Sequence, residues 1–196
     1  MQVKLWVFVA FIMASMFLAN CLIAQEAPNW AKEEKTDPLR EVKFLQFSLD
    51  GKFLTPPRNL GADAKPTIIL RCTPGSFVHG RTHGKFLSGY VYVGAVVDTH
   101  IDSSGTSVPV QFRLDEGKLQ NANWSHSTDY SSIFFEEIDL NTLLYGHFMF
   151  HKENTSSQVK KIVIGIDEYL GGEVVMQFDL PDSSEVAEAC GVTWYK

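Results

Sequence analysis

The chain has 196 residues, of which 45% are hydrophobic and 20% are charged, and its formal net charge at pH 7 is −6. This length and composition are typical of one globular domain, and they exclude a low-complexity or wholly disordered chain. The acidic balance and the lack of a Lys/Arg run argue against a nucleic-acid-binding protein, because phosphate binding needs a clustered basic surface.

The first 24 residues predict a signal peptide and therefore export to the periplasm or the medium. Lys4 supplies the positive start, Leu5–Leu18 forms the apolar run, and Ala24 is a small residue before the expected cleavage point. The run is short for a membrane span, which needs about 20 apolar residues. Two alternatives stay open, a retained N-terminal anchor and a lipoprotein acylated at Cys21, and only these would place the protein on a membrane.

The cysteine count becomes informative once export is expected. Removal of Cys21 with the signal peptide leaves Cys72 and Cys190, which an oxidising compartment would pair. The competing interpretation is a catalytic thiol, which needs a nearby histidine and a lowered pKa. Only His79 lies near either cysteine in sequence, so we predict a disulfide that ties the end of the chain to the beginning of the domain.

The first part of the exported chain predicts few elements. Residues 25–40 are charged and contain prolines, which predicts a flexible lead-in. Residues 41–54 predict two short strands around the turn dipeptide Asp50-Gly51, and residues 55–66 have the composition of a loop. Strands are expected over 67–72 and, after a Gly/His-rich loop, over 86–97.

Residues 108–115 show the clearest strand pattern, because Val108, Val110, Phe112 and Leu114 share one face. A tight turn at 115–118 leads into a return strand over 118–124. Further short strands and two short helices are predicted from the same kinds of pattern. The strands are 131–138, 147–153, 160–167 and 173–180, and the helices are 139–146 and 183–190. Many short strands with few helices predict a mainly β fold, a single antiparallel β-sandwich domain over residues 41–196.

Two groups of polar residues are candidates for binding. Trp124, Ser127 and Asp129 form a polar cluster beside an aromatic residue, a combination typical of glycan binding. The alternative, which we favour, is a core tryptophan followed by a hydrogen-bonded turn. Arg113 and Asp115 belong to a recognition surface or, as we prefer, to structural ion pairs with neighbouring strands.

The histidines raise the question of a metal site, which needs three or four ligands converging on one point at about 2–2.3 Å. His79 and His83 lie in one loop without helical spacing, whereas Asp98, His100 and Asp102 in a second loop place alternate side chains on one face. No G-x-S-x-G elbow, P-loop or dinucleotide fingerprint is present. We therefore predict no metal, no cofactor and no enzymatic activity, and we keep an exported hydrolase or metal-dependent enzyme as the alternative.

Several short segments, taken in order, resemble a known family. They read "TIILRC", "GYVYVG", "VPVQFRLDEG", "NWSHSTD", "VMQFDL" and "EAC". Over roughly residues 65–196 the chain resembles the type VI secretion-associated TagO/VasI-like family of exported bacterial proteins. The matching positions are Cys72, Val110-Arg113-Asp115, Trp124-Ser127-Thr128-Asp129, Phe178-Asp179-Leu180, and Cys190 with Trp194. The resemblance implies an accessory, non-enzymatic protein of the bacterial envelope.

Together these observations predict an exported binding module that contacts an envelope protein or a cell-wall glycan. Loops at 73–89 and 98–107 are the expected contact regions, because loops on a rigid sandwich concentrate binding residues. A purely structural assembly subunit is the remaining alternative.

Overall fold

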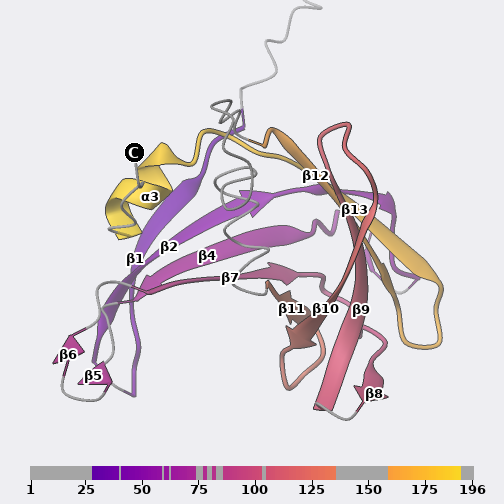
Figure 1. Ribbon diagram of the computed structural model, residues 1–196, viewed down its shortest axis with the longest axis horizontal. Coiled ribbons are helices and arrows are strands. Elements are labelled where there is room, and N and C mark those ends of the chain that lie inside the picture. Colours follow the sequence, from indigo (N-terminus) through magenta and orange to yellow (C-terminus); the bar gives the residue numbers. More distant parts are fainter. Residues whose placement is uncertain are drawn as a thin grey trace, which may run out of the picture.

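The computed structural model describes residues 28–39, 41–58, 60–61, 63–73, 77–78, 81–82, 86–102, 105–135 and 159–190. Figure 1 shows a mainly β protein with one short helix among these residues. The strands are β1 (Ala31–Thr36), β2 (Lys43–Asp50), β3 (Lys52–Thr55), β4 (Thr67–Thr73), β5 (Phe77–Val78), β6 (Arg81–Thr82), β7 (Phe86–Tyr92), β8 (His100–Asp102), β9 (Gly105–Leu114), β10 (Gln120–His126), β11 (Ser132–Phe134), β12 (Lys161–Asp167) and β13 (Glu173–Asp179), and the helix is α3 (Ser184–Cys190).

The main sheet is antiparallel and runs in the order β1-β2-β4-β7-β11-β10-β9-β12-β13-β3, with β8 added beside β9. It bends so that β1, β2, β4 and β7 form one layer and β9, β10, β12 and β13 cross it as a second layer (Figure 1). The expected antiparallel β-sandwich is confirmed. Its two layers are joined by continuous hydrogen bonding through the short strand β11.

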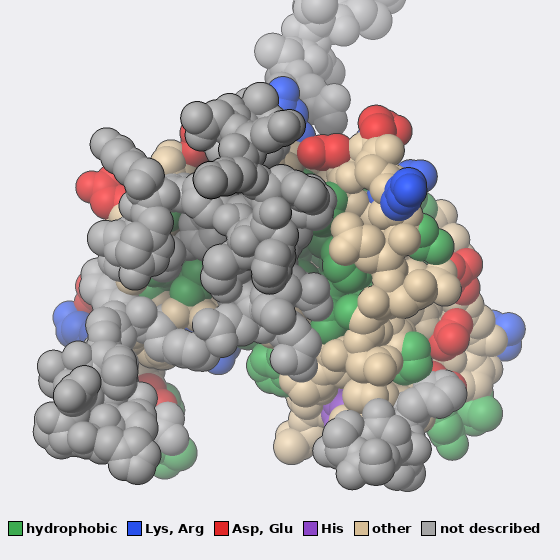
Figure 2. Space-filling model, in the orientation of Figure 1, with side chains coloured by type: hydrophobic (Ala, Val, Ile, Leu, Met, Phe, Trp, Pro, Cys, Tyr) green, Lys and Arg blue, Asp and Glu red, His purple; other side chains and the backbone are tan. Residues whose placement is uncertain are grey.

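The core lies between the layers and follows the period-two pattern of the sequence. In β9 the side chains of Val108, Val110 and Phe112 are buried, whereas Pro109 and Gln111 are exposed. β4, β12 and β13 alternate in the same way, and one cluster of buried side chains includes members of both layers. Figure 2 shows hydrophobic side chains in the middle of this view and most charged side chains around its margin. Burial of alternate residues therefore sets which face of each strand points inward.

The turn dipeptide at Asp50-Gly51 does not close a hairpin, as its sequence suggested. β2 pairs with β1 and β4, whereas β3 pairs with β13 in the other layer. Gly51 is the corner where the chain crosses between layers. A Cβ placed on Gly51 would lie 2.5 Å from Cδ1 of Phe178 and 2.6 Å from the carbonyl oxygen of Gln177. The glycine is required by this close approach to β13.

The predicted flexible lead-in is wrong for residues 31–36, which form β1 and pair along their whole length with β2. All six residues of β1 are exposed, so the strand lacks the alternation that reveals a strand in a sequence. Its Lys and Glu side chains suit an edge strand, because charges there discourage pairing with another chain. Two ion pairs, Lys32–Glu185 and Lys43–Glu34, connect this edge to α3 and β2.

Helix α3 covers one end of the core, where it packs against β2 and β4. Its helical signal was visible in the sequence, and the Asp182 carboxylate accepts a hydrogen bond from the N–H of Ser184 at 2.7 Å. The Sγ atoms of Cys72 and Cys190 are at bonding distance, with the Cα atoms 5.0 Å apart. The predicted disulfide is thus present and fixes the helix to β4. The helix predicted at 139–146 and the strand predicted at 147–153 lie outside the described residues.

Candidate functional site

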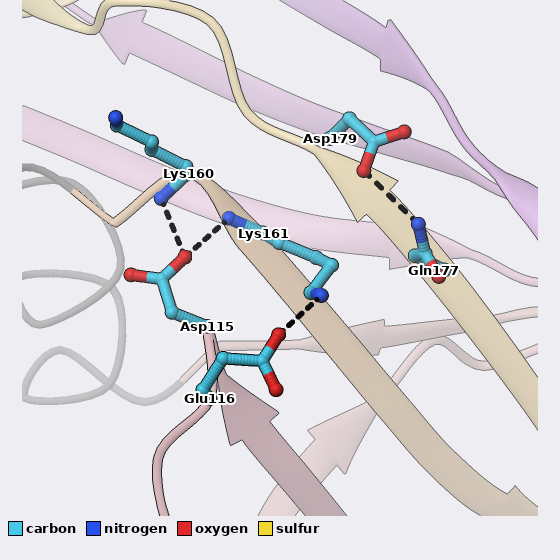
Figure 3. A network of polar contacts seen from close by, with 6 residues as sticks. All are labelled: Asp115, Glu116, Lys160, Lys161, Gln177 and Asp179. Atoms are coloured by element: carbon cyan, nitrogen blue, oxygen red, sulfur yellow. Dashed lines mark hydrogen bonds and ion pairs between the residues drawn. The ribbon is translucent and has the colours of Figure 1, made fainter.

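Asp115 was a candidate binding residue. In the structure it follows the last residue of β9, and its side chain contacts the backbone at the start of β12. Its Oδ1 accepts hydrogen bonds from the backbone N–H groups of Lys160 and Lys161, both at 2.9 Å (Figure 3). Asp115 has a positive φ of 48°, in the left-handed region that Asp tolerates better than most residues. Its carboxylate fixes the start of β12 against the end of β9, and no ion pair joins Asp115 to another of the described residues.

The ion pair of this region joins Lys161 to Glu116, whose atoms are 2.9 Å apart (Figure 3). The hydrogen bond and the charge of Lys161 hold the pKa of Glu116 below its ordinary value, with a smaller effect of the same sign from Arg113. Arg113 is exposed on the outer face of β9. It remains a surface cation in a mixed-charge neighbourhood.

Trp124 lies in the core with an exposed fraction of 1%. Its ring contacts Phe135 at a centroid distance of 4.8 Å and Phe112 at 5.7 Å. An aromatic platform for a sugar needs an open ring face, so Trp124 does not supply one. Trp124 is a core residue, as the favoured interpretation of the sequence had it.

Ser127 and Asp129 hold the turn between β10 and β11. The Oδ1 atom of Asp129 accepts hydrogen bonds from the hydroxyls of Ser127 and Ser131 and from the N–H of Ser131. These bonds, led by that from Ser127, hold the pKa of Asp129 below its usual value. The hydroxyl oxygen of Ser127 also accepts a bond from the N–H of Ser132 at 3.0 Å. The structure thus brings Ser127 and Asp129 together as a self-contained turn and separates both from the buried ring of Trp124.

The histidines of the two loops lie mostly outside the described residues. His79 and His83 lie outside the described residues, and the side chain of His100 is likewise not described. Within the part of the chain that the structure describes, no three His, Cys, Asp or Glu side chains come together as metal ligands would. The described parts of the loops expected at 73–89 and 98–107 contain β5 and β6 and the hairpin of β8 with β9.

A surface that the sequence did not predict lies at the end of the second layer that is opposite Asp115. Three segments meet there, and we call residues 93–98, 127–131 and 167–172 the turn cluster. The N–H of Val97 donates to the carbonyl of Tyr130 at 3.0 Å, and the N–H of Asp98 donates to that of Asp167 at 2.8 Å. The N–H of Tyr169 donates to the carbonyl of Val96 at 3.0 Å. These bonds connect residues 93–98 to the other two segments. The buried side chain of Val97 fixes residues 93–98 to the core.

The turn cluster presents large hydrophobic side chains to solvent. The exposed fractions are 82% for Leu170, 58% for Tyr169, 50% for Val96 and 39% for Tyr130. Tyr130 and Leu170 also have positive φ angles of 59° and 55°. Glycine or asparagine would adopt this conformation at a lower free-energy cost. The ring of Tyr130 stacks on that of His126 at a centroid distance of 4.5 Å, whereas the side chain of Leu170 is mostly exposed. Strained positions of this kind cluster at functional sites.

The charge of the turn cluster has one dominant sign. Its three segments contain the carboxylates of Asp98, Asp129, Asp167 and Glu168 and no Lys or Arg. Arg58 approaches from outside, donating through its backbone N–H to Oε2 of Glu168 at 3.1 Å and through Nη1 to the carbonyl of Leu170 at 3.5 Å. The turn cluster thus combines exposed apolar side chains with carboxylates on a backbone held by hydrogen bonds, with Arg58 against one of its turns.

Comparisons of this chain with known proteins identified no similar protein. No protein-family model matches the chain, and neither the curated proteins nor the solved structures include a match. No helix among the described residues is long and apolar enough to cross a membrane. The functional proposal therefore rests on the geometry of the turn cluster and on the sequence.

Proposed function

We propose that this chain is an exported, non-catalytic binding module of the cell envelope that recognises a basic protein partner through the turn cluster. The observation that carries the proposal is the exposed pair Tyr169 and Leu170 on a fixed hairpin tip, next to Val96 and Tyr130. Tyrosine is among the residues that supply most of the binding energy at protein interfaces, and the buried centre of an interface is more apolar than its rim. The surrounding carboxylates favour a partner with Lys or Arg at its rim, because complementary charges speed encounter and select partners.

The proposed location rests on two supports. The N-terminal segment has the pattern of a signal peptide, and the Cys72–Cys190 disulfide suits an oxidising compartment. The structural roles of two polar candidates support a non-catalytic protein. Asp115 accepts hydrogen bonds from the backbone at the start of β12, and Asp129 accepts hydrogen bonds within its own turn. The resemblance to the TagO/VasI-like family agrees with an accessory envelope role and forms part of the proposal.

Site-specific photocrosslinking in cells tests the protein contact. A crosslinking residue replaces Tyr169. The control position is Leu119, which is 59% exposed in the turn between β9 and β10, whereas the turn cluster includes the residues after the other end of β10. We expect a discrete crosslinked band from position 169 and none from position 119. A Leu170→Asp substitution should abolish that band, because it places a charge in the apolar centre. Equal labelling from both positions, or no adduct from position 169, would refute the proposal.

A further inference from the structure

The outer face of the first layer carries a second group of side chains that the turn cluster does not include. In this layer, Tyr90 of β7 lies opposite Ile69 of β4 and Phe134 of β11. These residues point away from the core, since their neighbours Leu70, Val91 and Ile133 are fully buried. We call the group the Arg71 face, and its members are Phe44, Gln46, Arg71, Tyr90, Tyr92 and Phe134.

Arg71 is held in a fixed orientation by neutral groups. Its Nη2 donates to the hydroxyl of Tyr90 at 2.7 Å, and its Nε donates to Oε1 of Gln46 at 3.3 Å. The guanidinium carbon lies 4.9 Å from the ring centroid of Tyr90 and 5.5 Å from that of Phe44. Stacking on aromatic rings suits a planar guanidinium and limits its rotation. The fork of donors is thus oriented before any ligand binds.

No carboxylate among the described residues pairs with Arg71. The ion pairs within the described residues all involve lysines, and none brings a carboxylate to Arg71. A guanidinium has five N–H donors, and the bonds to Tyr90 and Gln46 engage Nη2 and Nε. Nη1 donates to no described residue, and we place the carboxylate of a ligand on this side of the fork. Arginine binds carboxylates in a paired geometry that lysine does not reproduce.

Exposed aromatic rings continue the face along the strands from Arg71, because Phe134 lies opposite Tyr90 and Tyr92 lies opposite Thr67. The exposed fraction is 44% for Tyr92 and 36% for Phe134, and the ring centroids of Tyr90 and Phe134 are 5.5 Å apart. The face is formed by side chains alone, because β4 and β7 each pair on both sides and use their backbone groups in the sheet. A peptide lying flat here would bury N–H and C=O groups without partners, which is costly. A sugar ring instead presents C–H groups to the aromatic rings and keeps its hydroxyls at the rim.

We propose that the Arg71 face binds a saccharide that carries a carboxylate, with a sugar ring on Tyr92 and Phe134 and the carboxylate on Arg71. This site shares no residue with the turn cluster and goes beyond the protein contact proposed there. The two proposals therefore fail separately, because crosslinking from position 169 does not depend on Arg71.

Isothermal titration calorimetry on the purified full chain, with its disulfide intact, provides the test. The acidic probes are hyaluronan tetrasaccharide and tetragalacturonate, and the neutral control is chitotetraose, which shares its N-acetylglucosamine with hyaluronan. We expect at least one acidic probe to bind about tenfold or more tightly than chitotetraose, and Arg71→Lys to weaken it about tenfold. The matched variant Arg113→Lys changes an exposed arginine on the outer face of the other layer and should leave the affinity unchanged.

Three results would overturn the inference. The first is that neither acidic probe binds at about millimolar concentration, and the second is that chitotetraose binds equally well. The third is that hexaglutamate binds as tightly as the acidic saccharides, which would make Arg71 a site for acidic peptides. Thermal unfolding of Arg71→Lys and Tyr92→Ala verifies that a lost signal reflects the binding surface, and Tyr92→Ala should weaken the acidic probe while leaving the fold intact.

Discussion

A methyl group added at Gly51 is expected to destabilise the whole sandwich, because this residue is the corner between the two layers. The new Cβ would lie 2.5 Å from Cδ1 of Phe178 and 2.6 Å from the carbonyl oxygen of Gln177. Carbon atoms in good contact are about 3.5–4.0 Å apart, so the overlap with Phe178 is about 1 Å or more. Phe178 is fully buried, and Gln177 pairs with β12 and β3. Relief therefore requires β13 or the corner to move.

Overpacking a well-packed core costs about 1–3 kcal/mol, and we expect Gly51→Ala to lie at the upper end, at about 2–3 kcal/mol. Urea unfolding followed by tryptophan fluorescence measures the free energy of unfolding of the variant and of the wild type. Gly61→Ala is the matched control, because a Cβ there meets nothing within 4 Å, and its effect should stay within about 0.5 kcal/mol. Equal stability of Gly51→Ala and Gly61→Ala would refute the assignment of Gly51 as a tightly packed corner.

Two further predictions concern the disulfide and the turn at Asp129. The Cys72–Cys190 bond spans 118 residues, so replacing both cysteines with alanine should lower the free energy of unfolding by about 5 kcal/mol in the chain-entropy model. Urea midpoints measure this, and a reductant that shifts the double variant as much as the wild type would contradict it. The lowered pKa of Asp129 stabilises the fold above the ordinary value of 3.8, and this contribution is lost as the pH falls through the lower folded-state pKa. The stability advantage of the wild type over Asp129→Asn should thus be constant near neutral pH and shrink in acid, and a pH-independent difference would exclude this role.

The sequence predicted most strands correctly because burial of one sheet face imposes a period of two. β4, β9, β12 and β13 all lie where that alternation is clear. β1 was missed, because a fully exposed edge strand has no buried face to mark it. The expected strand over 86–97 ends at Tyr92, and the following residues form one segment of the turn cluster, where Val93 and Val97 stay buried.

The candidate binding residues show where inference from one sequence stops. The hydroxyl and carboxylate groups after Trp124 allowed either a polar site or a hydrogen-bonded turn, and the structure shows the turn that we favoured. The turn cluster consists of three short segments that are far apart in the chain, and only the tertiary structure brings their backbones together. A local signal was available in "DEYLGG", where an apolar pair occupies a hairpin tip that usually holds polar residues.

The sequence by itself determined the β character of the domain, the inward face of its main strands and the Cys72–Cys190 pair. These features follow from local alternation and from a cysteine count, which need no knowledge of distant neighbours. Only the tertiary structure decided that β2 and β3 belong to different layers, that β1 joins the sheet, and that Arg71 stacks between Tyr90 and Phe44. Each of these depends on strand order and register, which bring together residues far apart in the chain and leave no mark in any single segment.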